Sequence, residues 1–319
     1  MKAQAVVFTQ PRALSLQALA LPALQAGQLE VAVDYSGIST GTERMLWDGS
    51  MPPFPGMGYP LVPGYETVGR VVRTGPEASM AAGQTVFVPG ANCFGESGVR
   101  SLFGGAASRL VVTEQKVLPV SNHLGPQAVL LALAATAYHA VSGGGAGEPY
   151  APPELIVGHG VMGRLLARLT VAAGLPAPTV WETNAQRRAG QHGYPVLHPN
   201  DDARKDYGAV YDVSGDASLL DALIQRLRPG GEVVLAGFYH QPLQFAYAPA
   251  FMREARIRVA AEWKRADLLA VDALVRDGQL SLDGLITHTE PCERAPEAYA
   301  TAFGDAACLK MILDWSACA

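Results

Sequence analysis

A glycine-rich turn between an apolar strand pattern and a helical pattern constrains this fold more than any other feature of the sequence. Residues 155–157 predict a buried strand, and residues 161–173 predict an amphipathic helix. Between them stand Gly158, Gly160 and Gly163, in the spacing GxGxxG. The first glycine allows a tight turn, the second lets the backbone approach a pyrophosphate, and the third permits close helix–strand packing. In this context the pattern predicts a dinucleotide-binding turn.

The residues after this turn predict how the dinucleotide is held. Val161 and Met162 begin the helix, where free backbone N–H groups and a partial positive charge suit phosphates. Glu182 ends the next predicted strand, where an acidic side chain accepts hydrogen bonds from the adenosine ribose hydroxyls. A carboxylate there repels a 2′-phosphate, which favours NAD over NADP. Arg187 and Arg188 follow closely and would suit a 2′-phosphate, so NADP stays open as an alternative.

The middle of the chain alternates between strand and helix patterns. A helix is expected at 124–141, followed by a flexible stretch rich in glycine and proline at 142–153. Beyond the glycine turn, the predicted strands are 179–182, 209–213, 232–236 and 257–262, and the predicted helices are 217–227 and 266–277. Such alternation indicates βαβ units and a parallel sheet covered on both faces.

The two ends of the chain have a different pattern. Short β-type runs bounded by glycine or proline are expected as strands at 30–35, 67–72 and 85–88. Prolines concentrated between residues 51 and 64 indicate an ordered loop, because each proline fixes φ and removes a backbone donor. This first third is typical of a compact β-barrel-like unit. The tail predicts strands at 285–287 and 309–313 around an alanine-rich helix, and we expect it to pack back on the first third.

The composition excludes several classes of function. A formal net charge of -5 with no long basic run gives no attraction for nucleic acid. No uninterrupted apolar run approaches the roughly 18 residues that span a bilayer. The four cysteines, Cys93, Cys292, Cys308 and Cys318, form no CxxC pair. The sequence therefore predicts neither a local zinc lobe nor a disulfide framework, and we expect a cytoplasmic protein.

Several stretches resemble the medium-chain dehydrogenase/reductase superfamily. They are 60–66 (PLVPGYE), 136–140 (TAYHA) and 229–237 (PGGEVVLAG). The resemblance covers the whole chain and implies an α/β fold with two domains. These are a GroES-like β-barrel-type catalytic domain at 1–123 and 282–319, and a Rossmann domain with a doubly wound parallel sheet at 124–281.

Other stretches resemble one branch of that superfamily, the 3-hydroxyethyl bacteriochlorophyllide a dehydrogenases of bacteriochlorophyll biosynthesis. They are 36–44 (SGISTGTER), 54–59 (FPGMGY), 180–184 (VWETN) and 251–256 (FMREAR). The resemblance implies NAD-dependent oxidation of the 3-(1-hydroxyethyl) group of a bacteriochlorophyllide-type macrocycle to 3-acetyl. A homodimer formed at the edge strand 257–262, and a peripheral position at the photosynthetic membrane, are both compatible with it.

The resemblance also implies that the zinc sites of the superfamily are missing. Zinc-dependent relatives have a cysteine where this chain has Ser39 or Thr40, a histidine where it has Tyr65, and a third ligand at Ala132 or Leu133. None of these side chains is a suitable zinc ligand, and the single carboxylate that follows Tyr65 does not hold a catalytic zinc. We therefore predict no metal.

Two hydroxyl groups are the catalytic candidates that the resemblance implies. Thr42 matches the hydroxyl that relays protons in relatives, and the phenol of Tyr65 stands where it could donate to the substrate oxygen. Thr42 is explained equally well as a turn hydroxyl, and Tyr65 as a packed aromatic. Further matches place Thr136 against the nicotinamide, and Lys310 and Thr40 near the phosphates, and each is explained equally well as structural.

One proline-rich region gathers large apolar side chains, among them Trp47, Phe54, Met57 and Tyr59. They predict either core packing or subunit contact, or one apolar wall of a pocket for a flat macrocycle. His159, inside the glycine turn, is expected to be partly exposed near the phosphates.

Two other functions stay open at this point. The first is a zinc-free quinone or enoyl reductase; such enzymes commonly use NADPH, which Glu182 disfavours. The second is a catalytically inactive relative that binds the cofactor only, which the intact Gly158, Gly160 and Gly163 disfavour.

Overall fold

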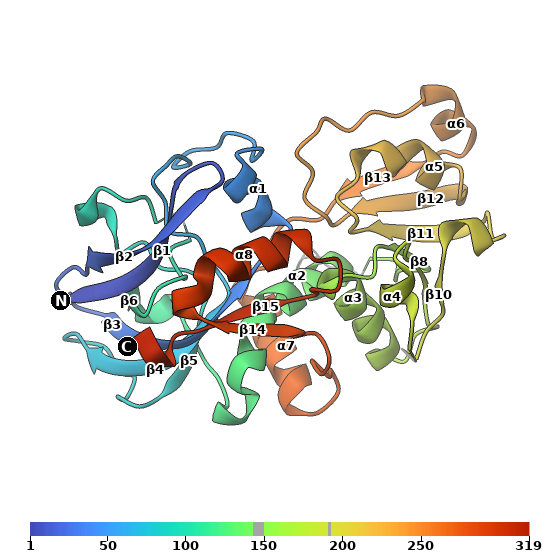
Figure 1. Ribbon diagram of the computed structural model, residues 1–319. Coiled ribbons are helices and arrows are strands. Elements are labelled where there is room, and N and C mark those ends of the chain that lie inside the picture. Colours follow the sequence, from blue (N-terminus) through green and yellow to red (C-terminus); the bar gives the residue numbers. More distant parts are fainter. Residues whose placement is uncertain (102, 143–149, 191–192, 319) are drawn as a thin grey trace. The chain divides into compact units, whose positions relative to one another are not determined.

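The computed structural model describes residues 1–101, 103–142, 150–190 and 193–318 and consists of two compact units (Figure 1). Unit 1 comprises Met1–Ala132 and Asp283–Ala319, and unit 2 comprises Leu133–Leu282. The boundaries expected from the sequence were 1–123 with 282–319, and 124–281. The first junction lies later than expected because the 3-10 segment η3 (Asn122–Leu130) packs against strands of unit 1.

Unit 1 is built around antiparallel β-structure. Its described strands are β1 (Lys2–Gln10), β2 (Ala13–Ala20), β3 (Gln28–Ile38), β4 (Thr67–Thr74), β5 (Thr85–Val88), β6 (Arg109–Thr113), β7 (Leu118–Pro119), β14 (His288–Pro291) and β15 (Met311–Asp314). Strands β1 and β2 form a ribbon, and the larger sheet has the order β14-β15-β3-β4-β5-β7, with β6 also paired to β3. The helices α1 (Thr42–Asp48) and α8 (Ala295–Gly304) complete the unit.

The tail of the chain returns to unit 1, as the sequence predicts. Strand β15 pairs antiparallel with β3, with Met311 opposite Ile38. The strand expected at 285–287 is displaced and begins only at His288, where β14 comes into register with β15. The reason is local: the Thr287 hydroxyl accepts a hydrogen bond from the Leu309 N–H at 3.0 Å, so a side-chain contact precedes the ladder.

Unit 2 contains the predicted doubly wound parallel sheet. Its described strands are β8 (Leu155–Val157), β9 (Thr179–Trp181), β10 (Val196–Leu197), β11 (Tyr207–Asp212), β12 (Leu227–Leu235) and β13 (Arg256–Val259). They pair in parallel in the order β10-β9-β8-β11-β12-β13. The helices are α2 (Leu131–Val141), α3 (Val161–Ala172), α4 (Ala185–Arg188), α5 (Leu220–Ile224), α6 (Tyr247–Met252) and α7 (Arg265–Arg276). Strands β8 and β11 are buried throughout, as expected for a sheet covered on both faces.

Two helices expected in this region are shorter than the sequence pattern indicated. The expected helix 124–141 is a 3-10 segment with a kink at Gly125 (φ +50°), and α2 begins only at Leu131. The expected helix 217–227 is reduced to a 3-10 turn and α5. The glycines after Pro229 do not simply stop a helix, since they lie inside β12, where the pairing with β11 shifts register after Tyr207.

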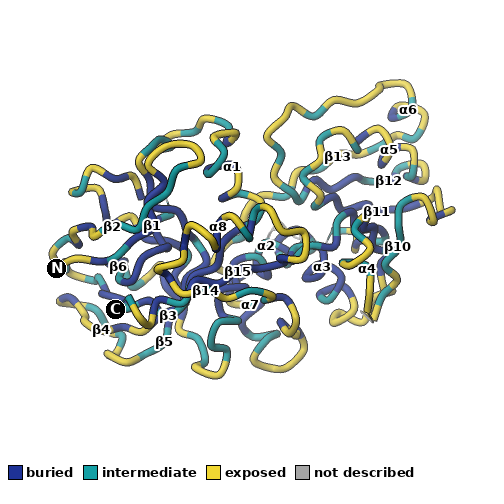
Figure 2. The backbone as a smooth tube through the Cα atoms, viewed as in Figure 1, coloured by how far each residue is buried: buried dark blue, intermediate teal, exposed yellow. Residues whose placement is uncertain are grey.

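Figure 2 shows which residues of these elements are buried and which are exposed. The run Asn122–Val141 is long and apolar enough to cross a membrane, but 56% of its apolar window is buried inside the protein, as in the core helix of a folded domain. Within the stretch expected to be flexible at 142–153, residues 143–149 lie outside the described part of the chain.

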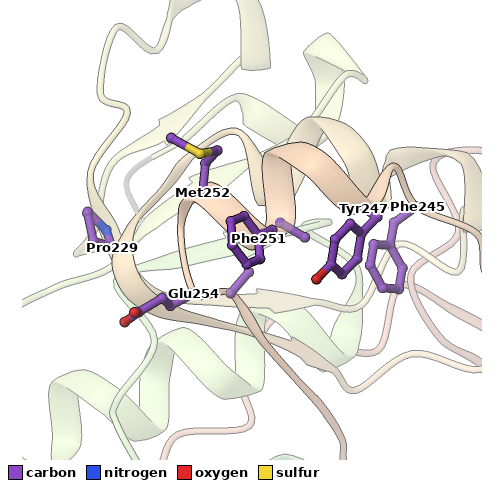
Figure 3. Close-up of a pocket in the computed structure, with 8 residues that line it drawn as sticks. Pro229, Phe245, Tyr247, Phe251, Met252 and Glu254 are labelled. Atoms are coloured by element: carbon purple, nitrogen blue, oxygen red, sulfur yellow. The ribbon is translucent and has the colours of Figure 1, made fainter.

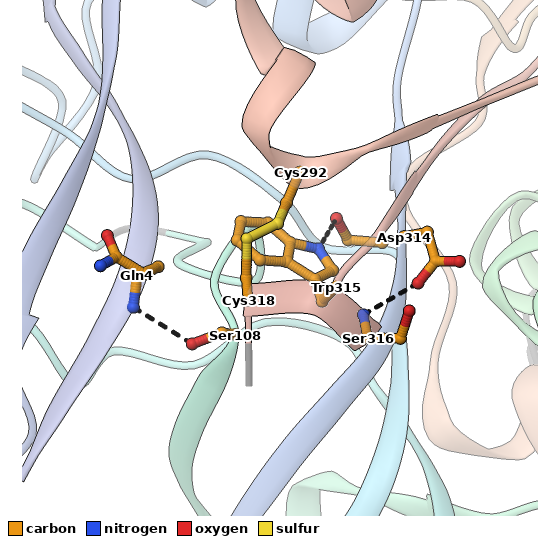
Figure 4. The surroundings of a disulfide bond; sticks show 8 residues. Gln4, Ser108, Cys292, Asp314, Trp315, Ser316 and Cys318 are labelled. Atoms are coloured by element: carbon orange, nitrogen blue, oxygen red, sulfur yellow. Dashed lines mark hydrogen bonds between the residues drawn. A yellow bond between two sulfur atoms is a disulfide. The ribbon is translucent and has the colours of Figure 1, made fainter.

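A disulfide joins Cys292 to Cys318, which corrects the expectation that the cysteines stay unlinked (Figure 4). The two residues are 26 apart in sequence, and their Cα atoms are 6.7 Å apart. They meet because β15 returns the tail beside the residues that precede α8. Trp315 lies next to the bond, is fully buried, and donates from its indole N–H to the Ser36 hydroxyl at 2.8 Å. Cys93 and Cys308 are buried and take no part in this disulfide.

Candidate active site

The glycine turn of unit 2 has the backbone geometry that its sequence predicts. Gly158 adopts φ +105°, a conformation that residues with a Cβ rarely adopt. A Cβ on Gly163 would lie 1.9 Å from the carbonyl oxygen of Gly158, so only glycine lets α3 pack this close to the turn. A Cβ on Gly160 would meet nothing within 4 Å among the described residues. The middle glycine therefore leaves open space where a ligand can approach the backbone.

The first turn of α3 faces this space without a side-chain cap. Gly160 is the N-cap residue and has no side chain that could cap the helix start. Val161 is buried and Met162 half-buried, so their contribution to a ligand is through backbone N–H groups. These features, an open backbone and an uncapped helix start, fit the pyrophosphate of a nicotinamide dinucleotide.

Glu182 follows β9 and is held under the turn. Its carboxylate accepts hydrogen bonds from the N–H groups of His159 at 3.2 Å and Asn184 at 2.8 Å, and its side chain is nearly buried. The guanidinium of Arg188 donates to the backbone carbonyls of Glu182 and Thr183 at 2.9 and 2.6 Å. In this conformation Arg188 is bound to backbone, and the carboxylate lies beside the turn where a ribose is expected.

His159 is not partly exposed, contrary to the sequence-based expectation. It is fully buried, and its two ring nitrogens contact the Arg187 carbonyl at 2.8 Å and the Tyr194 hydroxyl at 3.1 Å. The guanidinium of Arg164 also donates to the carbonyls of His159 and Arg187, at 3.1 and 3.2 Å. The imidazole therefore connects the glycine turn to α4 and to Tyr194, which follows α4.

Sequence reasoning missed Asp212 and Tyr239 at the same edge of the sheet. The Asp212 carboxylate accepts from the Ser214 N–H at 2.9 Å and from the Tyr239 hydroxyl at 2.8 Å. Burial raises the pKa of Asp212, and hydrogen bonds from Ser214 and Tyr239 oppose the rise. The backbone of Ser214 packs against Gly158. The pair of Asp212 and Tyr239, which holds the Ser214 N–H, therefore supports the glycine turn. The positions of Asp212 and Tyr239 in the sequence did not indicate this contact, because the two residues meet only through the pairing of β11 with β12.

The hydroxyl candidates of unit 1 do lie together. The Tyr65 phenol donates to the Ser39 hydroxyl at 2.6 Å, and the side chain of Thr42, the first residue of α1, is near enough to lower the pKa of Tyr65. Burial is the main cause that raises the pKa of Tyr65, and the nearby Glu66 carboxylate raises it further. The phenol therefore stays neutral at physiological pH and acts as a hydrogen-bond donor. Thr40 is half-buried in the same segment.

Behind these hydroxyls lies a buried charge cluster. Lys310, expected near the pyrophosphate, donates from its ammonium to Glu66 at 2.6 Å and to the Ile38 carbonyl at 3.2 Å. Glu43, the second residue of α1, is fully buried beside this pair and accepts from the Tyr299 hydroxyl at 3.1 Å. Sequence reasoning missed Glu43; its place directly after Thr42 was the available signal.

The remaining predicted residues divide between the two units. Thr136 is half-buried on α2 in unit 2. In unit 1 the predicted pocket wall is packed against the hydrophobic core: all four side chains, Trp47, Phe54, Met57 and Tyr59, are partly buried there. Trp47 meets Phe8 edge to face, with ring centroids 5.6 Å apart, and Tyr59 donates to the Leu46 carbonyl. These contacts agree with the core-packing interpretation, and the macrocycle pocket stays a prediction.

An apolar pocket that the sequence did not indicate lies in unit 2 (Figure 3). It is lined by residues of and around α6, among them Phe245, Tyr247, Phe251 and Met252. All four side chains are exposed. The pocket lies in the segment that leads from β12 to the edge strand β13.

Within the described ranges, one group of side chains has the spacing of a metal site, namely Cys292, Glu293 and Cys318. Its two sulfur atoms form the disulfide, and the group lies away from the hydroxyl candidates on the sequence and in the sheet. The positions that hold zinc in relatives, Ser39 or Thr40 and Tyr65, present hydroxyl groups here.

Comparisons with known proteins agree with this arrangement. The alcohol dehydrogenase GroES-like domain family matches residues 25–122, which confirms the predicted GroES-like domain. The chain is 56% identical over 315 residues to the 2-desacetyl-2-hydroxyethyl bacteriochlorophyllide A dehydrogenase of Rhodobacter capsulatus, with 99% of both chains covered. It is 53% identical over 322 residues to the protein of the same name from Cereibacter sphaeroides, with 100% of both chains covered.

Solved structures show the same fold at lower identity. The L-idonate 5-dehydrogenase of Escherichia coli superposes with a TM-score of 0.84 at 18% identity, and the match covers 98% of both chains. A likeness at this identity concerns the fold alone.

Proposed function

Because this chain belongs to the family of the 2-desacetyl-2-hydroxyethyl bacteriochlorophyllide A dehydrogenases, we propose that it oxidises the 3-(1-hydroxyethyl) group of a bacteriochlorophyllide-type macrocycle to 3-acetyl, with NAD and without zinc. The observation that carries the proposal is the identity of 56% over nearly the whole length of both chains. The product is the acetyl-bearing pigment precursor of bacteriochlorophyll biosynthesis.

Unit 2 holds the cofactor in this proposal. When bound, the nicotinamide would supply the hydride acceptor for oxidation of the carbinol carbon. Gly160 and the backbone N–H groups of Val161 and Met162 would hold the pyrophosphate, while Gly158 and Gly163 shape the turn. Glu182 accepts hydrogen bonds from the adenosine ribose, and its negative charge favours NAD over NADP. Thr136 would bind the nicotinamide, and Thr40 would bind a phosphate.

Residues of unit 1 act on the oxygen and the proton of the substrate hydroxyl group. Tyr65 and Thr42 are the residues we assign to the substrate hydroxyl: the neutral phenol donates a hydrogen bond to the oxygen, and Thr42 passes its proton on. The macrocycle packs against an apolar wall. The wall consists of the side-chain surfaces that the core leaves uncovered on Trp47, Phe54, Met57 and Tyr59. The conjugated ring next to the carbinol carbon delocalises charge as the hydride departs.

Incubation with NAD and 3-hydroxyethyl bacteriochlorophyllide tests the activity. We expect the long-wavelength absorption band to shift to the red as NADH accumulates, because an acetyl group extends the conjugation. Parallel reactions use NADP as the acceptor and an enone or quinone with NADPH. A protein that binds NAD but leaves the band unmoved would disprove the substrate assignment, and reduction of the enone or quinone would favour the reductase alternative. Failure to bind either dinucleotide would favour the inactive relative.

Variants of the two hydroxyls test the catalytic assignment. We expect Tyr65→Phe and Thr42→Val each to lower kcat at least about tenfold with little change in the affinity for NAD, because each removes a group that acts on the oxygen. The matched control is Tyr35→Phe in β3, a tyrosine of the same unit outside the cluster. Turnover retained in both Tyr65→Phe and Thr42→Val would refute the assignment.

The free edge of the parallel sheet supports a homodimer. Strand β13 ends the sheet order, and Ile257 and Val259 on it are 37% and 74% exposed. Edge pairing with a second copy would extend the sheet and cover these side chains. We propose a cytoplasmic dimer that collects its pigment at the photosynthetic membrane surface. Light scattering of Val259→Lys should give a monomer mass if this edge is the contact, and an unchanged dimer mass would exclude it.

A further inference from the structure

The segment that follows β9 carries two opposite charges that bear on the choice of dinucleotide. It runs from Glu182 to Arg188, contains α4, and is called the α4 segment below. Glu182 at its start favours NAD, because a carboxylate repels a 2′-phosphate. Arg188 at its end has the guanidinium group that binds phosphates well. The conformation of the α4 segment therefore decides which of the two charges a bound ribose meets.

The structure shows the α4 segment with its carboxylate oriented and its guanidinium bound to backbone. The two oxygens of Glu182 accept from two backbone N–H groups, that of His159 at Oε2 and that of Asn184 at Oε1. Arg188 turns back on its own segment and donates to the carbonyls of Glu182 and Thr183. This conformation fixes the acid in place and keeps the base on the backbone.

The buried imidazole of His159 holds the far end of the α4 segment. Its Nδ1 lies 2.8 Å from the Arg187 carbonyl oxygen, and because a carbonyl oxygen only accepts, Nδ1 carries the hydrogen. In the neutral ring, Nε2 then accepts from the Tyr194 hydroxyl at 3.1 Å. The Tyr194 ring also meets the imidazole edge to face, with ring centroids 5.7 Å apart. One side chain therefore joins the glycine turn to the end of α4.

His159 contacts both ends of the α4 segment, since its backbone N–H binds Glu182 and its ring binds the residue before Arg188. Arg164 on α3 is a second donor to the same Arg187 carbonyl, at 3.2 Å, and also donates to the His159 carbonyl at 3.1 Å. His159 is fully buried and Arg164 nearly so. Without the imidazole, the Arg187 carbonyl keeps one of these two donors, and the end of α4 is held less firmly.

We propose that His159 is a positioning residue that sets a preference for NAD over NADP, because it fixes the α4 segment in the conformation that orients Glu182 and keeps Arg188 on the backbone. This inference rests on the proposed dehydrogenase function, since it concerns the cofactor of that reaction. When the ring contact is lost, the end of the segment moves, Arg188 leaves the two carbonyls, and a 2′-phosphate meets a cation. The three glycines of the turn do not distinguish the two dinucleotides, whereas the residue between the first two of them does.

Calorimetric titration of the protein with NAD and with NADP tests the proposal without turnover. The wild type should bind NAD more tightly. His159→Leu should lower the ratio of the NADP to the NAD dissociation constant at least about tenfold, because NAD loses an oriented carboxylate and NADP gains Arg188. His159→Asn should restore most of the ratio, since its amide nitrogen stands at the position of Nδ1 and can donate to the Arg187 carbonyl. His123→Leu, at an exposed histidine of unit 1, is the control and should keep the wild-type ratio.

Two further variants separate the contributions. In the double variant His159→Leu with Arg188→Met, the gain in NADP affinity should disappear, because the cation for the 2′-phosphate is gone. Tyr194→Phe removes only the contact at Nε2, so its ratio should fall between those of the wild type and His159→Leu.

Three results would overturn the proposal. In the first, His159→Leu weakens the binding of both dinucleotides by the same factor, which is the result expected of a structural role alone. In the second, the ratio falls equally in His159→Leu and His159→Asn, so that the retained donor has no effect. In the third, the wild type binds NADP more tightly than NAD.

Limited proteolysis of the cofactor-free protein gives a readout that needs no dinucleotide. Trypsin cleaves after arginine, and the Arg187 carbonyl, which it would attack, is the one that accepts from His159 and Arg164. Cleavage between Arg187 and Arg188 should be about tenfold faster in His159→Leu than in the wild type, and His159→Asn should slow it again.

The two measurements together separate this inference from the proposed function. If cleavage follows the expected order but the wild type binds neither dinucleotide, the proposed function fails and the cofactor preference fails with it, while the positioning of the α4 segment stands. If the wild type prefers NAD, and His159→Leu keeps both the ratio and the slow cleavage, the inference about His159 fails alone.

Discussion

The glycine turn of unit 2 and the charge cluster of unit 1 are built in opposite ways. The turn is local, because Gly158, Gly160 and Gly163 lie within one strand–helix connection. These residues contribute backbone groups and open space rather than side chains. The cluster is assembled from distant parts of the chain, since Glu43 and Lys310 come from opposite ends of the sequence.

The difference teaches which kind of site tolerates change. A backbone site depends on the absence of side chains, so a single methyl group can block it. A buried charge cluster is stable only when its positive and negative charges compensate each other, so removal of one partner leaves the remaining charges uncompensated. The two sites also lie on separate compact units.

The largest effect should follow from breaking the ion pair of the cluster. Lys310→Met leaves Glu66 and Glu43 buried without a cation, and the free energy of unfolding should fall by about 3–5 kcal/mol. The double variant Lys310→Met with Glu66→Gln removes the stranded charge as well and should recover much of the loss. Urea unfolding at pH 7 measures both. A single variant as stable as the wild type would show that the pair is not what holds this region.

The disulfide offers a second, smaller test on the same unit. Removal of the Cys292–Cys318 bond should lower the free energy of unfolding by about 3 kcal/mol, because the bond closes a loop in the unfolded chain. Thermal unfolding with and without reductant measures the effect, and Cys318→Ser provides the control because its melting temperature should no longer respond to reductant. Binding of NAD by unit 2 should be unchanged. Loss of cofactor affinity on reduction would contradict the placement of the cofactor on unit 2.

The glycine turn should give the smallest changes in stability and the clearest changes in binding. Gly163→Ala places a methyl group against the Gly158 carbonyl and should cost about 1–3 kcal/mol of unfolding free energy, with NAD affinity at least about tenfold weaker. Gly160→Ala meets open space, so its stability should stay within about 0.5 kcal/mol of the wild type. Calorimetric titration of Gly160→Ala with NAD should still show weaker binding, because the methyl group occupies the pyrophosphate position. Full affinity in Gly160→Ala would contradict the placement of the cofactor.

The parts of the fold that the sequence predicted well are those with a strong local pattern. Strands β8, β9 and β11 and helices α3 and α7 fall close to their expected positions, since apolar runs and helical periodicity act over a few residues. The errors occur where tertiary contacts decide. Gly125 kinks the segment before α2, and the glycines after Pro229 join β12 through a shift in register. His159 is buried because Tyr194 and Arg187 close over it.

The sequence by itself determined the dinucleotide-binding turn and the parallel sheet around it, because each depends on residue types at short spacing. The expectation that the relatives' zinc ligands are missing came from the resemblance to those relatives. Only the tertiary structure decided the chemistry of unit 1. Burial gives Glu43 a proton affinity near neutral pH, and the return of β15 beside β3 brings Lys310 to Glu66 and Cys318 to Cys292. Solvent exclusion and long-range pairing are properties of the folded chain, so no local pattern could have revealed them.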